Sequence, residues 1–444
     1  MCYYPTHTEV HMKKLIRFIS AILAAMLCAT AFSACANGAK PPVTDVTTDA
    51  SATAEPIHAL DIWDGTVAAS FGGGNGSKEA PYEIATAAQL AYLADVINHD
   101  KVYTGKYFVL TADLDLANIP WTPIGNGMYH FDGIFDGKGH TITNLTIING
   151  FNYAGPSEGT WDDESYTSGL FGSCSNAVLK NLNITHAYLS TENAKNRHQV
   201  NAGILVGDMR ADKSLELSNV KIEDSSIVCV YDLEREVPRG QNIGGVAGYV
   251  RTEEEATYTI FNLQSTIAVS IENIQPRDND IGGIAGVLFL SDYGKVNNCA
   301  SYLSVELDQE RCYSNDNYFG AFGFLATVSG KVSVTNVFSK VSVNKIFDYY
   351  FKYPAYTANV IAGHISHVTN DSGFCFENVF GYVEQKDEIT GEIAISLQLN
   401  DISQSAIYSE VNCKGCTELP AEHNFDTEVW NLDSPEAPVL KFQN

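Results

Sequence analysis

The sequence predicts an all-β protein built as a parallel β-solenoid. Three observations support this fold class: two short phrases recur at one shared period, β-branched residues abound, and no helical period is visible between residues 123 and 400. An antiparallel β-sandwich is the structural alternative, but it would not require a constant period. A repeat of roughly 38 residues over this span predicts about seven coils.

The first 34 residues are predicted to be a lipoprotein signal peptide. Three basic residues precede the apolar run FISAILAAMLCATAF, which is shorter than a membrane span. The order Phe32-Ser33-Ala34-Cys35 resembles a bacterial lipobox, so Cys35 is the predicted lipidation site and the anchor to a membrane. An ordinary secretory signal is the alternative. Met12 suits the start of such a signal better than Met1.

Residues 35–58 are predicted to form a flexible tether, because they are rich in Ala, Thr, Pro and Asp and have no periodicity. Residues 59–122 are predicted to form an α/β cap that covers the first coil. Its helix lies in TAAQLAYLADVIN, where Thr86 and Gln89 match a capping box and Leu90, Leu93, Val96 and Ile97 share one face. The alternating stretch YFVLTADLDL follows.

The first repeated phrase is dense in glycine and occupies the predicted solenoid, residues 123–400. Its last glycine recurs at differences of 35, 41, 38, 37 and 40, at Gly172, Gly207, Gly248, Gly286, Gly323 and Gly363. Small residues between Ile, Val or Phe allow a strand to lie close to the opposite coil or to turn sharply.

The second phrase places an asparagine between apolar residues. It recurs at differences of 37, 38, 43, 36, 38 and 42, at Asn144, Asn181, Asn219, Asn262, Asn298, Asn336 and Asn378. Apolar residues stand two before and one after each asparagine, and both can face one core only if the chain bends there. Asparagine tolerates the left-handed conformation, so these seven positions are predicted to be corners whose amides stack into a hydrogen-bonded ladder.

Residues 401–444 break the period and are predicted to form a C-terminal cap. The glycine phrase resembles the GLUG motif of bacterial surface proteins, with SGLFG as the best match; FDGIFDGKGHTITNLTI, WTPIG and PVLKF resemble such proteins as well. The resemblance covers residues 59–444 and implies a right-handed β-helix on an adhesin-like lipoprotein. It implies no reaction.

Charge and composition limit the partners. The formal net charge is −26, so nucleic acid is not an expected partner. We expect an extracytoplasmic protein that binds a glycan or a host surface protein without catalysis. A carbohydrate-active enzyme (glycoside hydrolase or polysaccharide lyase) and a passive surface spacer are the alternatives. No metal or cofactor is expected.

Aromatic loops that enter the glycine strands are the predicted ligand-binding site. Their candidate residues are Trp161, Tyr166, Tyr349, Tyr350, Tyr353 and Tyr356. The alternative is that these rings fold back and cover the core. Cys299 is predicted to be a buried thiol, and CKGC at 413–416 to form a small disulfide.

Overall fold

The computed structural model describes most residues of one unit, Ala59–Asn444. The predicted signal peptide, Cys35 and the tether lie outside the described residues. Those described are 61–100, 103–148, 151–152, 165–191, 199–230, 241–272, 279–291, 293–307, 320–344, 356–358, 360, 362–365, 373–386, 393–396, 407–411, 413–417, 425–433 and 438–441.

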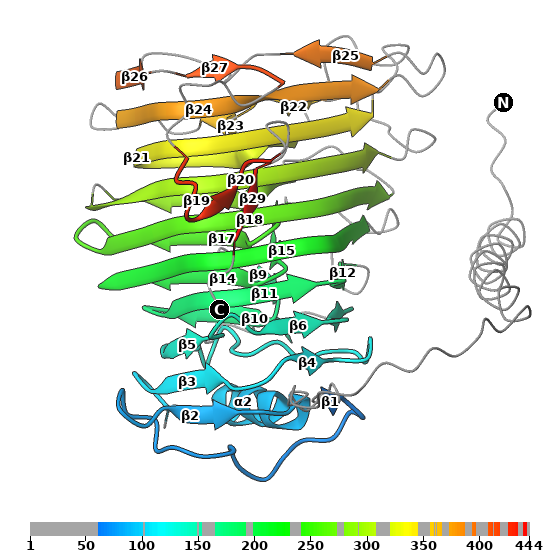
Figure 1. Ribbon diagram of the computed structural model, residues 1–444, viewed down its shortest axis with the longest axis vertical. Helices are drawn as coiled ribbons and strands as arrows, with labels where there is room; N and C mark the ends of the chain where they lie inside the picture. Colours follow the sequence, from blue (N-terminus) through cyan, green and yellow to red (C-terminus); the bar gives the residue numbers. More distant parts are fainter. Residues whose placement is uncertain are drawn as a thin grey trace, which may run out of the picture. The chain divides into compact units, whose positions relative to one another are not determined.

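The described chain is mostly β with one helix and forms a parallel β-solenoid after an N-terminal segment (Figure 1). Each coil lays its strands beside the equivalent strands of the next coil. The pairing is parallel along the solenoid, which excludes the antiparallel sandwich. We call its two sets of strands the corner wall, which carries the asparagines, and the crease wall, which carries the glycine phrase.

The N-terminal segment contains the helix α2, Ala87–His99, as predicted. The Thr86 hydroxyl accepts from the Gln89 backbone N–H, while the Gln89 side chain accepts from the Ala85 backbone N–H. The helix buries Leu90, Leu93 and Ile97. The segment's strands are β1 Asp61–Ile62, β2 Tyr82–Ile84, β3 Tyr107–Leu110, β4 Leu114–Asp115, β5 Ile134–Asp136, β6 Thr141–Thr143 and β7 Thr146–Ile147.

The corner wall is built from strands that turn at an asparagine (β11, β15, β18, β20, β21 and β24) and from shorter strands beside them. They are β11 Val178–Thr185, β12 Tyr188–Ser190, β15 Ser214–Val230, β18 Thr257–Glu272, β20 Tyr293–Leu307, the second part of β21 Gly320–Asn344, β24 Gly373–Lys386, β25 Ile393–Ser396, β26 Ile407–Val411 and β27 Lys414–Gly415. All seven predicted asparagines have a φ between 51° and 59°. Both flanking apolar positions are buried at every one of them.

The asparagine side chains form the predicted amide ladder. Each Nδ2 donates to the Oδ1 of the preceding coil, from Asn219 to Asn181 at 2.8 Å, Asn262 to Asn219 at 2.8 Å, Asn298 to Asn262 at 2.5 Å and Asn378 to Asn336 at 3.2 Å. Asn336 shifts by one residue and donates to Asn297 instead. The ladder begins at the carboxylate of Asp136, which accepts from Asn181.

Asn144 does not belong to this ladder, contrary to the prediction. In the parallel register Thr143 pairs with Thr185, so Asn144 aligns with His186, which also has a left-handed φ of 54°. Its Nδ2 donates to Asp115. The first coils therefore have a second corner, and the spacing of 37 residues between Asn144 and Asn181 joins two different corners.

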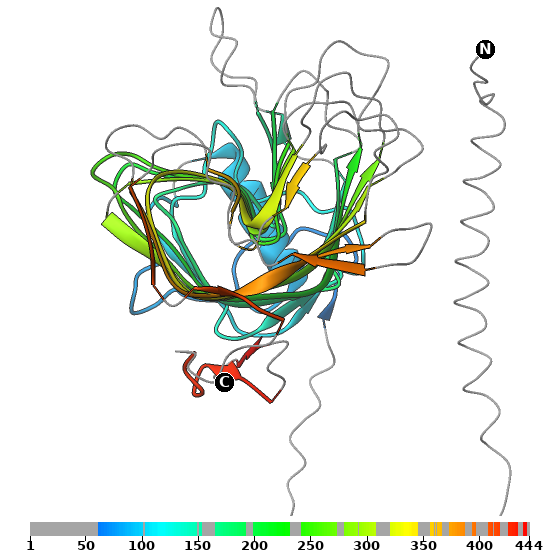
Figure 2. The same cartoon turned by 90° about the horizontal axis from the view of Figure 1, so that it is seen from above.

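The crease wall carries the glycine phrase on shorter strands. They are β8 Phe151–Asn152, β9 Ser165–Ser168, β10 Phe171–Ser175, β13 Gln199–Gly203, β14 Val206–Ala211, β16 Gln241–Gly244, β17 Ala247–Thr252, β19 Asn279–Leu290, the first part of β21, β22 Tyr356–Ala358 and β23 Ala362–Ile365. Seen along the solenoid, this wall bends inward between the two strands of each coil (Figure 2).

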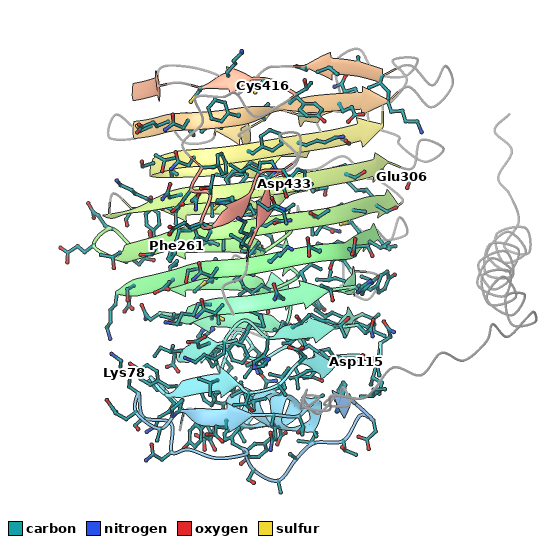
Figure 3. The ribbon with its side chains drawn as sticks, viewed as in Figure 1. Lys78, Asp115, Phe261, Glu306, Cys416 and Asp433 are labelled. Atoms are coloured by element: carbon teal, nitrogen blue, oxygen red, sulfur yellow. The ribbon has the colours of Figure 1, made fainter. Side chains whose placement is uncertain are left out.

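Within residues 401–444, β26 and β27 add to β24 at the end of the solenoid, whereas the C-terminal hairpin covers its side. The hairpin comprises β28 Trp430–Asn431 and β29 Val439–Leu440, with Asp433 beyond β28 (Figure 3). Trp430 packs with outward-facing apolar residues of the corner wall, including Phe338 and Phe380. Gln264 of β18 accepts a hydrogen bond from the Leu440 backbone N–H at 2.6 Å. An apolar strip on the wall makes this lateral position favourable.

No helix in the described part of the chain combines the length and the apolar character that crossing a membrane would require.

Candidate functional site

The last glycines of three successive phrases, Gly207, Gly248 and Gly286, lie at the inward bend of the crease wall, where no room exists for a side chain. A Cβ added at Gly207 would lie 2.5 Å from the Ser168 backbone nitrogen, and one added at Gly286 would lie 2.6 Å from that of Ile243. In each case the obstacle is backbone of the preceding coil. At these two positions a Cβ would have to displace backbone. Gly323 does not share this position, contrary to the predicted period: it pairs with Gly282, and Ala326 stands in the phase of Gly286, where the register shifts by one residue.

The middle glycines solve a different problem inside the solenoid. A Cβ added at Gly283 would lie 2.6 Å from the Ser301 side chain of the corner wall, and Gly245 likewise faces Ser265. The two serines are fully buried and pair in register. The walls therefore approach closely at this point, which confirms that the small residues permit both close approach and a sharp turn.

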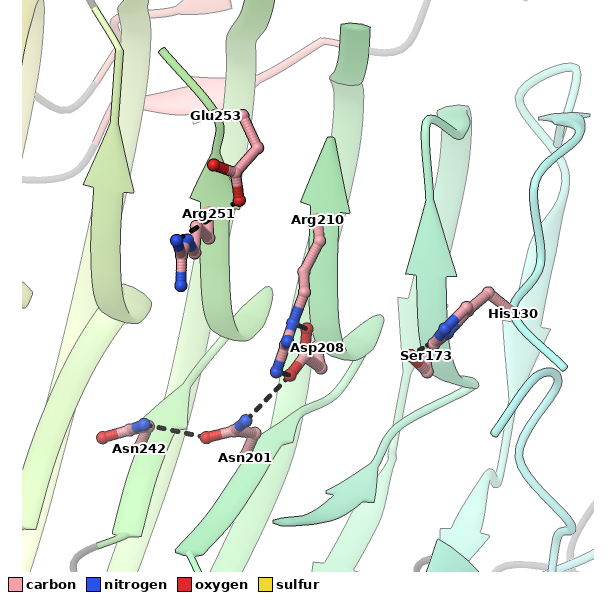
Figure 4. A network of polar contacts seen from close by, with 8 residues as sticks. All are labelled: His130, Ser173, Asn201, Asp208, Arg210, Asn242, Arg251 and Glu253. Carbon is pink, nitrogen blue, oxygen red and sulfur yellow. Dashed lines mark hydrogen bonds and ion pairs between the residues drawn. The ribbon is translucent and has the colours of Figure 1, made fainter. Parts of the chain in front are cut away.

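The bend brings polar side chains together on the outer surface of the crease wall. Asn201 on β13 donates through Nδ2 to Asp208 on β14 at 3.0 Å, across the bend. Asn242, on the next coil, donates to Asn201 at 2.8 Å. All three residues are 2% exposed. Figure 4 shows them as one chain of contacts that ends at Asp208.

Asp208 holds an arginine in a fixed position. Its carboxylate accepts two hydrogen bonds from Arg210, from Nε and from Nη2, both at 2.9 Å. Such a bidentate pair fixes both the orientation and the position of the guanidinium. The Arg210 side chain is 50% exposed, whereas that of Asp208 is 3% exposed. The Arg210 guanidinium is therefore presented at the surface and is held there by buried, hydrogen-bonded side chains.

A second arginine lies beside the first, one coil further on. Arg210 pairs in register with Arg251, and Arg251 pairs with Phe289. The Arg210 guanidinium lies 5.9 Å from the ring centroid of Tyr249, and that of Arg251 lies 5.5 Å from the ring centroid of Phe289. We call the side chains of Arg210, Tyr249, Arg251 and Phe289 the arginine–aromatic row.

Electrostatics in the row are balanced. Arg251 Nη2 lies 3.2 Å from Glu253, whose side chain is 60% exposed. Burial raises the pKa of the Tyr249 hydroxyl, and the charge of Asp208 raises it further, while both arginines oppose that shift. Tyr249 therefore remains a neutral phenol at physiological pH. Two arginines and two carboxylates give the network no net charge.

One serine–histidine pair lies at the start of the same face. His130 Nδ1 is 2.7 Å from the Ser173 hydroxyl, and Ser173 pairs in register with Asp208 (Figure 4). The Ser173 backbone N–H donates to the Gly125 carbonyl, and the Ser173 carbonyl accepts from the Phe131 N–H. The serine backbone thus links the N-terminal segment to the crease wall.

Most of the predicted ligand-binding residues lie outside the described residues: Trp161, Tyr349, Tyr350 and Tyr353. Tyr356 begins β22, but its side chain is not described. Tyr166 is 5% exposed and belongs to the hydrophobic core. That ring therefore has the alternative role of core packing, and no ligand can stack on it.

Cys299 is fully buried, as predicted, and burial raises the pKa of its thiol to about 12. Cys413 and Cys416 flank β27 and are half-buried; their disulfide remains a prediction. Asp136 accepts from the Lys138 backbone N–H in a tight turn. Within the described ranges, no group of acidic, His or Cys side chains is arranged to hold a metal ion.

The arginine–aromatic row was missed in the sequence, although a signal was present. Arg210, Arg251 and Phe289 each stand three residues after the last glycine of their phrase, at Gly207, Gly248 and Gly286. The same phase of the repeat therefore places them in one line on neighbouring coils. Arg210 and Arg251 are also the only arginines in the described part of the chain.

Comparison with known proteins places the chain near two much longer sequences. No protein-family model matches it. A protein of Evansella cellulosilytica described as "Putative Gly-rich membrane protein" is 30% identical over 173 residues, which are 37% of this chain and 17% of that protein. Halomucin of Haloquadratum walsbyi is 28% identical over 225 residues, 43% of this chain and 2% of halomucin. The chain thus spans less than a fifth of either relative.

A solved structure is also similar to this chain. It is described as a "putative immunoglobulin A1 protease" from Bacteroides ovatus, with a TM-score of 0.49 and 16% identity, covering 84% of this chain and 96% of that one. The fold and the sequence match to the Evansella protein define a β-solenoid protein distantly similar to a Gly-rich membrane protein.

Proposed function

We propose that this protein is a lipid-anchored, extracytoplasmic binding protein of the GLUG-motif type, which adheres to a glycan or a host surface protein without catalysis. The observation that carries the proposal is the arginine–aromatic row, a line of polar and aromatic side chains displayed in register on the outer wall. The lipobox at Phe32–Cys35 supports the anchor. The descriptions of the two relatives, a membrane protein and a halomucin, agree with surface display.

The fold supports binding through repetition. Neighbouring parallel strands lie about 4.8 Å apart, so residues in the same phase form a straight line of contacts along the solenoid. Such a line suits an extended ligand whose own units repeat. We further propose that the solenoid is right-handed, with about seven coils, as the GLUG resemblance implies.

The anchor is tested in bacterial cells that express the full chain. Cys35→Ser should abolish incorporation of labelled fatty acid and release the protein from membranes. Cys28→Ser, within the signal peptide, is the matched control and should leave both unchanged. Unchanged membrane retention of Cys35→Ser would overturn the lipoprotein assignment.

Binding is tested by exposing the purified full chain to arrays of glycans and of host surface proteins. We expect at least one ligand on the arrays. The aromatic loops are tested with Trp161, Tyr350 and Tyr353 replaced by Ala, which should abolish binding at these loops without changing Tm. Absence of any bound ligand would favour a passive spacer, and a simultaneous loss of stability would assign the rings to the core.

A further inference from the structure

The arginine–aromatic row combines features that a packing surface does not need. Phe289 is 40% exposed on the outer face of the crease wall, and the Arg251 side chain beside it is 43% exposed. The Arg251 Nε atom has no hydrogen-bond partner, although the atom itself is buried. Because that Nε is buried, a ligand would be bonded by the exposed part of the Arg251 side chain beside the ring.

The buried polar side chains beneath the row keep it rigid. Asn242, Asn201 and Asp208 are almost fully buried and are linked in series, and Asp208 fixes Arg210 through two bonds. Arg210 leans over Tyr249, and Arg251 over Phe289. A site held in this way loses little conformational entropy when a ligand binds.

Charge indicates the class of ligand. Asp208 and Glu253 balance Arg210 and Arg251, so the row together with these two carboxylates has no net charge, while the whole chain has a net charge of −26. An acidic polymer would be repelled by the chain and would have to displace Glu253 from Arg251. A basic polymer would meet the exposed guanidinium groups. An uncharged ligand meets neither obstacle.

We propose that the arginine–aromatic row binds an uncharged polysaccharide; this inference rests on the proposed binding function. The apolar face of a sugar ring stacks on Phe289, and its hydroxyl oxygens accept hydrogen bonds from Arg251 and Arg210. Because the row continues from coil to coil, successive sugars lie along it. Asp208, Asn201 and Asn242 are positioning residues that hold Arg210.

The test measures binding of the purified full chain to three immobilised polysaccharides: mannan, polygalacturonate and chitosan. We expect binding to mannan. Phe289→Ala should weaken it by about tenfold or more, the effect of losing a contact at the centre of an interface. Phe289→Tyr keeps the stacking ring and should retain binding. Arg251→Gln should weaken binding as well, because a neutral amide replaces the guanidinium.

The matched control is Tyr188→Ala. Tyr188 is 38% exposed but lies on β12 of the corner wall, so its loss should leave binding unchanged. Undiminished binding of Phe289→Ala would place the ligand elsewhere and overturn the inference while leaving the proposed function intact. Preference for polygalacturonate or chitosan would overturn the assigned class. A fall in Tm of Phe289→Ala, with binding by the remaining folded protein unchanged, would assign the row to packing.

Discussion

The corner and the crease both recur once per coil, but different physics maintains them. At the corner, asparagine adopts a left-handed φ and its amide bonds to the coil before it, as Asn262 does to Asn219. At the crease, Gly248 is required because there is no room for a side chain: an added Cβ would lie 2.7 Å from the backbone of Asn201. The corner therefore depends on a hydrogen bond between coils, whereas the crease depends on the absence of a side chain.

The difference predicts how each region tolerates change. A ladder bond can be lost while the neighbouring coils keep their geometry, so the cost is local and moderate. A Cβ at Gly248 cannot be accommodated without displacing backbone on the preceding coil, and interiors packed at this density resist such displacement. The crease should therefore be the less tolerant region, although its sequence is the simpler one.

The largest effect is expected in the crease. Gly248→Ala should lower the free energy of unfolding by about 3 kcal/mol or more, because overpacking here involves backbone atoms. Gly73→Ala is the control: its Cβ would meet the flexible end of the Glu83 side chain, which can move away. Urea unfolding of both variants measures the difference. Equal stability of the two would show that the bend is not closed by the glycines.

An intermediate effect is expected at the corner. Asn262→Leu should cost about 1–3 kcal/mol, because it removes a ladder partner and disfavours the left-handed backbone. Asn118 has the same left-handed φ, 58°, but is exposed and stands outside the ladder. Asn118→Leu therefore reports the backbone strain alone and should cost less. If both variants melted at the same temperature, the ladder would contribute nothing.

The smallest effect concerns the buried thiols of the corner wall. Burial raises the pKa values of Cys229 and Cys299 from 9.0 to about 12 in the folded protein. Above pH 9 the unfolded state loses these protons while the folded state keeps them, so stability falls as pH rises from 9 toward 12. At pH 10 each thiol should contribute roughly 1 kcal/mol to this loss. Cys299→Ala should reduce the drop measured between pH 8 and pH 10; an unchanged drop would contradict the assignment.

The sequence revealed whatever depended on local rules. The corners followed from apolar residues on both sides of asparagine, and the helix from Thr86 and its periodic leucines. The role of Asn144 could not be derived, because spacing alone does not distinguish two corners of one coil. The parallel register that separates them is a property of the assembled coils.

The candidate site could not be predicted, because its residues are far apart in the sequence or meet only in the folded chain. Asn201 and Asp208 meet only because the wall bends between them, and Arg210 and Arg251 meet only across coils. The lateral position of the C-terminal hairpin was equally hidden, since Gln264 and Leu440 are 176 residues apart. Aromatic density directed attention to the loops instead, where Tyr166 is a core residue.

Native-state thiol labelling of one variant tests most directly whether the two devices act independently. Cys299 follows the ladder residue Asn298 at the corner, whereas Cys174 lies on β10 of the crease wall, and both are buried. Asn262→Gly removes the ladder amide but keeps the left-handed backbone accessible. Loss of about 1 kcal/mol at the corner should raise the labelling rate of Cys299 by about fivefold. Mass spectrometry should show no change at Cys174, and an equal rise at both cysteines would contradict the account.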